Sequence, residues 1–371
     1  MNPAFQICQR CVMDTTDPKI EFDSAGICSH CKSYTQLKAQ WPLEFDLKEK
    51  TLEKNFSEIK KNGKGKEWDC LIGLSGGVDS SYIAYLAHLH GLRPLCVHLD
   101  NGWNSELATA NIHGIVSKLG FELHTHVIDW EEFKDLQKAF FKAHVVDIEM
   151  LSDHAIFGVI LQLARKYNLK HILSGANHST EAIMPKAWVH RKSDERNIKS
   201  IHSQFGSKKI KTFPFVSTLE HVFYMYGIGY RVHKPLNWID YNKARAKEIL
   251  MRELGWRDYG GKHYESIFTK FYQAHILPVK FNIDKRKAHL STLINSEQIT
   301  REEAMTELQK PLYSPQELES DTEYVCKKLS FSPQEFRDYL KSPPVAHSSY
   351  GSDQPIYDIL YWIHENMPRR T

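Results

Sequence analysis

The heptapeptide SGGVDSS, at positions 75–81, follows the apolar run CLIGL and precedes sequence with a helical period. Gly76 and Gly77 let the backbone bend sharply and let a ligand approach it closely. Backbone N–H groups and the positive end of a helix then converge on one spot, which favours an anion. Asp79 is unexpected at a site for anions alone, but a Mg²⁺ ion between the carboxylate and a phosphate explains it. The hydroxyls of Ser75, Ser80 and Ser81 add hydrogen-bond donors.

A second pattern is built from cysteines. Four of the seven cysteines form two Cys-x2-Cys pairs separated by sixteen residues: Cys8, Cys11, Cys28 and Cys31. This spacing is typical of structural zinc sites, and four thiolates complete a closed tetrahedral site. The segment has few apolar residues, so metal binding would supply part of its folding free energy. The alternatives are free thiols in a flexible tail and an iron–sulfur cluster, whose usual spacings differ. With four thiolates available, His30 is interpreted as a bystander.

These residues need elements that position them. Short apolar strands alternate with helix-like segments, which predicts crossover units and a mostly parallel, twisted sheet. The predicted strands are 70–75, 94–100, 121–129 and 171–176, and the predicted helices between them run to about 90 and over 104–119, 131–145 and 153–167.

The chain divides into four predicted regions. They are a four-cysteine zinc-binding module (1–40), a helical linker (41–66), a nucleotide-binding α/β domain (67–235) and a helical C-terminal region (236–371). In the last region, helical periods run over 242–254, 300–309, 314–329 and 332–341. The last three begin at Thr300, Ser314 and Ser332, each followed by Glu or Gln in the first turn, which is typical of capped helix starts.

Polar residues follow two of the predicted strands, where open α/β sheets bind ligands. Asp100 and Asn101 end the second strand, and turn formation is the alternative interpretation. Asn177, His178 and Glu181 follow the fourth strand. There the alternative is a helix start capped by Ser179 or Thr180, and both interpretations can hold together.

Composition narrows the class of protein. The chain has 371 residues, 42% hydrophobic and 25% charged, with a net charge of +3 that by itself does not argue for nucleic-acid binding. No apolar segment reaches the ~18–20 residues that span a bilayer, and the N-terminus lacks the regions of a signal peptide. We therefore expect a cytoplasmic protein with no membrane span. In a reducing compartment, Cys70 and Cys96 are expected to be buried thiols in strands.

The heptapeptide after a strand resembles the PP-loop of the ATP pyrophosphatase superfamily. It lacks the lysine of Gly-x4-Gly-Lys-Ser/Thr and is not Gly-x-Gly-x-x-Gly. Members of this superfamily split ATP to AMP and pyrophosphate while they adenylate a carbonyl oxygen. The resemblance implies a Rossmann-like α/β fold with ATP and Mg²⁺ as cofactors. The implied binding residues are Ser75, Gly76, Gly77, Asp79, Ser80 and Ser81 for pyrophosphate, with Asp100, Asn101, Asn177, His178 and Glu181 nearby, and Asp79 and Glu181 for Mg²⁺.

Further motifs narrow the family. They are CQRCVMDTTDP, GICSHC, LSGGVDSSY, VHLDNGWNSELA, SGANHSTEAIM, GWRDYGGKHYESIFTKFYQ and DKRKAHLSTLI. Together, from Cys8 to about Ala304, they resemble the N-acetyl sugar amidotransferase family of bacterial surface-polysaccharide and nonulosonic-acid pathways. The resemblance implies that an acetamido group of a sugar or nucleotide sugar becomes an acetamidino group. An amide oxygen is a poor leaving group, and adenylation lets it depart as AMP when ammonia attacks.

Two expectations follow for the substrate and for ammonia. Lys262, His263, Lys285 and Arg286 are candidates for binding the substrate or the developing phosphate charge, with a solvated surface as the alternative. Residue 2 is Asn and no Gly-x-Cys-x-Gly motif occurs, so the sequence carries no recognisable glutaminase nucleophile. The resemblance implies separate glutaminase and cyclase-like partners similar to those of imidazole glycerol phosphate synthase. A homo-oligomer is left open.

Two other functions compete with this interpretation. Some tRNA-thiolating PP-loop enzymes also combine a cysteine-rich zinc module with this loop. Such enzymes need reactive cysteines in the catalytic domain, and Cys70 and Cys96 form no Cys-x-x-Cys pair. The small net charge also argues against a large RNA footprint. A nucleotide-binding regulatory module would not need the Asp79 carboxylate.

Overall fold

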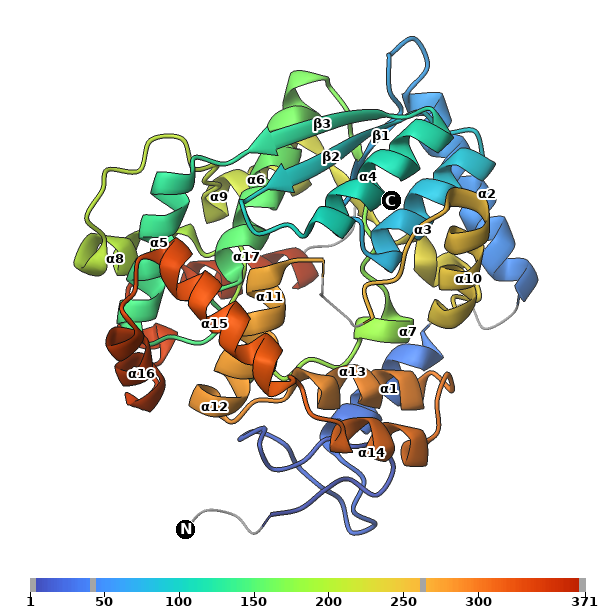
Figure 1. Cartoon of the computed structure of the whole chain (residues 1–371). Helices are drawn as coiled ribbons and strands as arrows, with labels where there is room; N and C mark the ends of the chain where they lie inside the picture. The colour runs from blue at the N-terminus through green and yellow to red at the C-terminus, as the bar shows by residue number, and fades with distance from the viewer. Residues whose placement is uncertain (1–4, 41–44, 261–264, 367–371) are drawn as a thin grey trace.

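A five-stranded parallel sheet lies at one end of the molecule (Figure 1). The computed structural model describes residues 5–40, 45–260 and 265–366. Within them the strand order is β3-β2-β1-β4-β5, and each neighbouring pair is parallel. The bounds are β1 Cys70–Gly73, β2 Pro94–Asp100, β3 Glu122–Val127, β4 His171–Leu173 and β5 Arg231–His233. The predicted α/β fold is confirmed. The edge strand β5 was not predicted, because three residues are too few to show a periodicity.

The direction in which strands are added reverses at β1. The chain places β2 and β3 on one side of β1 and then crosses to place β4 and β5 on the other. Such a reversal leaves a crevice outside the carboxyl ends of the two strands that flank it, here β1 and β4. The predicted phosphate-binding loop follows β1, so the topology places it at this crevice.

Side chains of β1 alternate between two hydrophobic layers. Cys70 and Ile72 pack with α3 (Val78–Leu89), α4 (Glu106–Leu119) and α10 (Lys243–Leu254). Leu71 packs on the other face with α6 (Met150–Lys166). The helix α2 (Phe45–Asn62) joins the first layer through buried apolar side chains. Most of the predicted linker is therefore a helix packed onto the α/β unit.

The C-terminal region is helical, as predicted. Its elements include α10, which corresponds to the helix predicted over 242–254, and then α11 Ile267–Phe271, the π-helix η4 Tyr272–Ile276, α12 Leu277–Phe281, α13 Lys285–Asn295, α14 Arg301–Gln309, α15 Pro315–Leu329 and α16 Pro333–Lys341. The predicted starts at Thr300, Ser314 and Ser332 are confirmed, since each has a reciprocal capping box with the Glu three residues later. The remaining helical segments are α1 Ser29–Ala39, α5 Trp130–Ala143, α7 His178–Glu181, η1 Lys186–Trp188, α8 Glu195–Phe205, α9 Thr218–Val222, η2 Phe223–Ile228, η3 Pro235–Trp238, η5 His347–Ser349 and α17 Gln354–Asn366.

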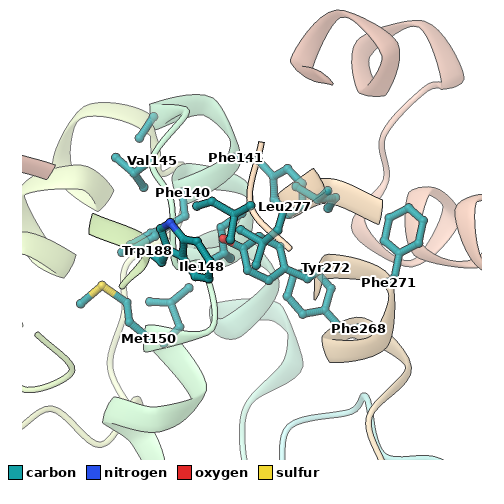
Figure 2. Close-up of a cluster of buried hydrophobic side chains, with 14 of the residues drawn as sticks. Phe140, Phe141, Val145, Ile148, Met150, Trp188, Phe268, Phe271, Tyr272 and Leu277 are labelled. Carbon is teal, nitrogen blue, oxygen red and sulfur yellow. The ribbon is translucent and has the colours of Figure 1, made fainter. Parts of the chain in front are cut away.

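A large aromatic cluster fastens the C-terminal helices to the α/β unit (Figure 2). Phe140 and Phe141 of α5 meet Phe268 and Tyr272 of the α11–η4 segment. The Tyr272 hydroxyl also accepts a 2.6 Å hydrogen bond from the backbone N–H of Asp147, which precedes α6. The π-helical segment is thereby held against the start of α6.

The N-terminal module packs on the C-terminal helices, away from the sheet (Figure 1). The N–H of Val12 donates to the Ser291 hydroxyl of α13 at 3.2 Å. Lys287 of α13 forms a 2.5 Å ion pair with the buried Asp14. Through α13, the module is therefore connected to the parts of the chain that face the crevice. Across the described ranges, no helix combines the length and the apolar character needed to cross a membrane.

Candidate active site at the switch point of the sheet

The loop after β1 is shaped by a glycine in the left-handed region. Gly76 has φ +82°, and a Cβ there would lie 2.9 Å from the Tyr259 hydroxyl and 3.0 Å from the Ala108 carbonyl oxygen. The Gly76 carbonyl accepts hydrogen bonds from Trp256 Nε1 at 2.8 Å and from the Tyr259 hydroxyl at 2.7 Å. The 256–259 segment therefore fixes the loop conformation, and a side chain at position 76 would disturb it.

A second close approach brings β4 against the start of α3. A Cβ on Gly175 would lie 3.0 Å from the Asp79 carbonyl carbon and 3.0 Å from the Ser80 nitrogen. The chain leaving β4 thus passes directly over the first turn of α3. This contact brings the segment after β4 and the loop after β1 together at the crevice.

The loop presents donors at the N-terminus of α3. Gly77 is the N-cap residue, and its N–H donates to the Ser75 hydroxyl at 3.3 Å. The Ser80 hydroxyl donates to the Gly77 carbonyl at 3.2 Å and lies 3.1 Å from the Ser75 hydroxyl. Small hydroxyls at the positive end of a twelve-residue helix are an arrangement that binds phosphate.

A cavity of ≈ 210 Å³ opens in front of this loop, and we call it the loop cavity. Ser75, Gly77, Asp79 and Ser80 line it, together with Glu181. The structure therefore brings together five of the residues predicted from two separate motifs. Other charged residues also line it: Lys243, Lys247, Asp258 and Glu265. Hard oxygen donors beside an anion-binding helix end are the donor set that suits Mg²⁺ shared with phosphates.

Tyr241 holds the Asp79 carboxylate in place. Its hydroxyl donates a short hydrogen bond to Asp79 Oδ1. Burial, and then the charge of Asp79, raise the pKa of Tyr241, so this hydroxyl stays protonated and remains a donor. No motif in the sequence marks Tyr241, Lys243 or Lys247 as site residues, because they lie far along the chain from the loop and reach it only through the packing of α10.

A larger cavity of ≈ 630 Å³ adjoins the loop cavity, and we call it the strand-end cavity. The two cavities share Ser75, Gly175 and Glu265. Apolar side chains from the strand ends and from α6 line it, and polar and charged residues lie among them, so it offers both apolar surface and polar groups to a small molecule. Its volume lies in the range of drug-sized ligand pockets, so it can hold a nucleoside.

The predicted pair after β2 divides between two roles. Asn101 lines the strand-end cavity, and its Nδ2 donates to the Ser152 hydroxyl of α6 at 3.0 Å. Asp100 does not line either cavity; it accepts the Gly102 N–H at 2.9 Å and so stabilises the turn. The turn-forming alternative therefore describes Asp100, and the structure offers Asn101 as the residue at the cavity.

The predicted group after β4 also divides. Glu181 lines the loop cavity. Asn177 is 4% exposed and accepts the Thr180 N–H at 2.9 Å, so it is the N-cap of α7. The helix-cap alternative is thus realised by Asn177 rather than by Ser179 or Thr180. His178 lines neither cavity, and burial followed by the charge of Lys234 lowers the pKa of its side chain.

The remaining predicted residues either line neither of these two cavities or lie outside the described residues. Ser81 is fully buried and lines neither cavity. Lys285 forms a 2.9 Å ion pair with Glu149, which lines the strand-end cavity. Arg286 pairs with Asp284 at 2.8 Å and donates to carbonyls at the end of α14, so it is held within the scaffold. Lys262 and His263 lie outside the described residues.

The four cysteines form one buried cluster. Their sulfur atoms all lie within 4.8 Å of one another, and each residue is 0% exposed. Backbone N–H groups of Arg10, Cys11 and Cys28 approach Cys8 Sγ at 3.3–3.4 Å, which favours a thiolate. Asn295 of α13 donates to Cys31 Sγ at 3.4 Å. Four converging sulfurs with supporting donors fit a closed zinc site.

The predicted bystander role of His30 agrees with its contacts. Its Nε2 bonds Asp17 Oδ2 at 2.7 Å, and it is not part of the sulfur cluster. The closed cluster leaves no open coordination position, and the module lies away from the sheet (Figure 1). The module therefore packs on α13 and contributes no residue to either cavity.

A buried histidine holds one wall of the strand-end cavity. His154 of α6 is 0% exposed; its Nε2 accepts the Val216 N–H at 3.1 Å, so its Nδ1–H donates to the Lys192 carbonyl at 2.8 Å. Lys192 lines the cavity and forms ion pairs with Asp147 at 2.7 Å and Asp153 at 3.0 Å. The neutral imidazole thus connects α6 to the segments before and after α8.

A protein-family model matches the C-terminal part of the chain. Residues 265–364 match the family model "LPS biosynthesis protein WbpG-like, C-terminal domain". This part of the chain is therefore similar to a WbpG-like C-terminal domain. The match bears out the resemblance to the N-acetyl sugar amidotransferase family that the sequence motifs suggested. The matched residues include α11 to α16, and those at their start contribute to the lining of the strand-end cavity: Glu265, Ser266, Phe268 and Thr269. No curated protein matches the chain.

Two solved structures are similar over parts of the chain. One is the predicted subunit of a tRNA methyltransferase from Methanocaldococcus jannaschii, with 13% identity, 48% of this chain and 74% of that chain covered, and a TM-score of 0.29. The other is NMN synthetase from Francisella tularensis, with 16% identity, 64% and 96% covered, and a TM-score of 0.30. At these scores neither decides anything about activity, and the strand order and the loop geometry of this chain establish its fold.

We predict one zinc ion per chain in the cysteine cluster. Cys11→Ser should reduce the zinc content from about one per chain to a small fraction and lower the thermal midpoint, because a closed site contributes folding free energy. Cys326→Ser, at a buried cysteine outside the cluster, should retain the metal. Elemental analysis and thermal unfolding check both, and iron with sulfide in the wild type would overturn the assignment.

Stability should fall on acidification because of His154. Burial lowers its folded pKa below the unfolded value of 6.5, so the unfolded chain binds more protons below that pH. The stabilisation is therefore complete above pH 6.5 and is lost below it, at up to ~1.4 kcal/mol per pH unit. His154→Gln keeps a donor and an acceptor without titrating, and urea unfolding of this variant should depend less on pH. The exposed His113→Gln should follow the wild type; equal pH dependence in all three would contradict the prediction.

Proposed function

We propose that this chain is an ATP-dependent amidotransferase that converts an acetamido group of a sugar or nucleotide sugar to an acetamidino group. The observation that carries the proposal is the pair of joined cavities at the switch point. One has phosphate-binding geometry and carboxylates, and the other has apolar walls and the volume of a nucleoside. The WbpG-like domain on the adjoining side supports a role in surface-polysaccharide synthesis.

The division of ATP between the cavities follows from their chemistry. Adenosine fits the strand-end cavity, and the β- and γ-phosphates fit the loop, where Ser75, Ser80 and the N-terminus of α3 donate. Lys243 and Lys247 oppose the loop across its cavity and offset the charge of departing pyrophosphate. Asp79 and Glu181 would hold Mg²⁺, which supplies charge neutralisation at the phosphates when bound.

The reaction balances with ammonia as the second nucleophile. The amide oxygen attacks the α-phosphorus, pyrophosphate leaves, and loss of the amide N–H proton gives an O-adenylyl imidate. Ammonia then adds to the imidate carbon, and the C–O bond breaks so that the oxygen leaves in AMP. The products are an amidine, AMP and pyrophosphate. The apolar walls of the strand-end cavity limit the access of water to the activated imidate.

The rival tRNA-thiolation chemistry lacks its reactive group at this site. Cys70 and Cys96 are fully buried in the sheet, and burial raises the pKa of Cys70 well above its usual value and that of Cys96 to about 12. Cys326 lies on α15, and burial raises its pKa to about 11. No cysteine in the described part of the chain lines either cavity, so none is positioned to carry sulfur there.

Asp79→Asn should lose Mg²⁺-dependent pyrophosphate release by roughly a hundredfold or more while the fold survives, because the amide cannot replace the charge of the carboxylate. The matched control is Asp240→Asn, at an exposed carboxylate shortly before α10 begins. Pyrophosphate release and thermal unfolding should separate the two variants. Full activity of Asp79→Asn at ordinary Mg²⁺ concentration would refute the role.

The isolated chain should make an amidine from an acetamido sugar with ATP and an ammonium salt, but not with glutamine. We propose that separate glutaminase and cyclase-like subunits supply ammonia to it. Activity with ammonium should rise from about pH 7 to about pH 9, because only neutral ammonia is nucleophilic. Mass spectrometry detects the exchange of an oxygen atom for NH, alongside AMP. Amidine formed from glutamine alone would show a glutaminase within this chain, and thiolation of tRNA would support the rival.

A further inference from the structure

A third cavity, of ≈ 620 Å³, lies beside the loop cavity, and we call it the basic cavity. Its walls come from the start of α10, the α11–η4 segment, α13 and the end of α14, so most of it belongs to the WbpG-like domain. Six cations and two carboxylates line it: Lys243, Lys247, Lys270, Lys285, Arg286 and Lys310 against Asp284 and Glu307. The strand-end cavity has the opposite balance, with Lys192 against Glu149, Asp153 and Glu265.

The basic cavity meets both parts of the candidate active site. It shares Lys243 and Lys247 with the loop cavity. Toward the strand-end cavity, Lys285 and Gln273 line the basic cavity and bond Glu149, each at 2.9 Å, and Glu149 lines the other side. This polar contact therefore lies between the two large cavities. Gln273 lies in the π-helix η4, a rare conformation that is frequent at functional sites.

The cations of the basic cavity differ in the carboxylates with which they form ion pairs. Arg286 and Lys310 pair with the two carboxylates of the cavity itself, Asp284 and Glu307. Three lysines pair with carboxylates outside its lining: Lys247 with Asp258, Lys285 with Glu149, and Lys270 with both Glu317 and Asp321. Within the described ranges, Lys243 has no ion pair. Because an ammonium group has three donors, the paired lysines can still donate to a ligand.

We propose that the basic cavity binds the acceptor sugar through a diphosphate handle, so that the substrate is a sugar carried on a diphosphate rather than a free sugar. This inference rests on the proposed function and specifies its substrate class. The lysines come from different elements around the cavity, and an anion with many oxygens can contact several of them together. The carboxylates of the strand-end cavity repel such a handle, so the neutral acetamido end is the part that reaches the ATP.

A nucleotide and a polyprenyl carrier offer the same diphosphate chemistry. The probes are therefore uridine diphosphate and farnesyl diphosphate, titrated by calorimetry into protein saturated with α,β-methylene ATP. Binding of either probe supports the handle, and the one that binds more tightly identifies its source. Failure of both to bind, or binding that added salt does not weaken, would overturn the proposal.

Variants locate the binding. Lys310→Ala removes an ammonium that is largely exposed, and it should weaken the probe that binds about tenfold, the cost of one charged hydrogen bond. Lys209→Ala, at an exposed lysine outside the cavity, should leave the affinity unchanged. If Lys310→Ala binds as tightly as the wild type while Lys270→Ala does too, the handle does not bind here and the proposal fails.

Acceptor kinetics separate this proposal from the proposed function. AMP release should be compared for N-acetylglucosamine, UDP-N-acetylglucosamine and N-acetylneuraminic acid, which carries a carboxylate without phosphate. The diphosphate-linked sugar should have the highest kcat/KM, and Lys310→Ala should raise its KM without changing kcat. Equal kcat/KM for all three, or preference for the carboxylate sugar, overturns the handle and leaves the amidotransferase standing. If no acetamido sugar consumes ATP but uridine diphosphate still binds in a Lys310-dependent manner, the proposed function fails and the anion site remains.

Discussion

The contact between the exit of β4 and the first turn of α3 is the constraint on which the site depends. Strand order reverses between β1 and β4, so the two strand ends open onto the same crevice. Gly175 lets the backbone after β4 pass within van der Waals contact of Asp79 and Ser80. Without that approach, the Asp79 carboxylate and the residues after β4 would belong to separate surfaces. With it, Glu181 and Asp79 line one cavity.

The C-terminal helix α13 connects the segment that follows β4 to the N-terminal module. Its Thr292 hydroxyl accepts the Ile183 N–H at 3.1 Å, and Ser296 donates to the Ser179 carbonyl at 2.8 Å, which holds the segment around α7. On its other side, Asn295 donates to Cys31 Sγ. The four-cysteine module is thus one helix away from the residues that follow β4. This segment has little apolar surface, so metal binding would stabilise its packing on α13. That structural role does not require the four cysteines to lie near the candidate active site.

The sequence could predict features that depend on residues close together in the chain, but not those that depend on contacts between distant segments. The loop, the parallel sheet and the capped helices rest on contacts between near neighbours, and each left a local pattern: Gly76 and Gly77 after an apolar run, or Ser314 three residues before a Glu. Tyr241, Lys243 and Glu149 left no such pattern, because they reach the site by packing of α10 and by the path of the chain into α6. Asn177 shows the limit of motif reasoning, since its position in the motif is explained by a helix cap.

Around the start of α6, ion pairs rather than apolar contacts join neighbouring segments of the chain. The buried Asp147 pairs with Lys192, whose side chain is partly exposed, and Lys285 and Glu149 form a largely buried pair close by. Desolvation makes such pairs poor contributors to stability compared with apolar side chains of similar size. The Lys285–Glu149 pair lies between two cavities of opposite charge balance, where an apolar residue on either side would leave Glu149 or Lys285 without its partner. Charge pairing at this wall therefore lets the fold place an acidic cavity and a basic cavity side by side. The proposed presentation of a neutral amide to ATP, with an anionic handle held apart, depends on that separation.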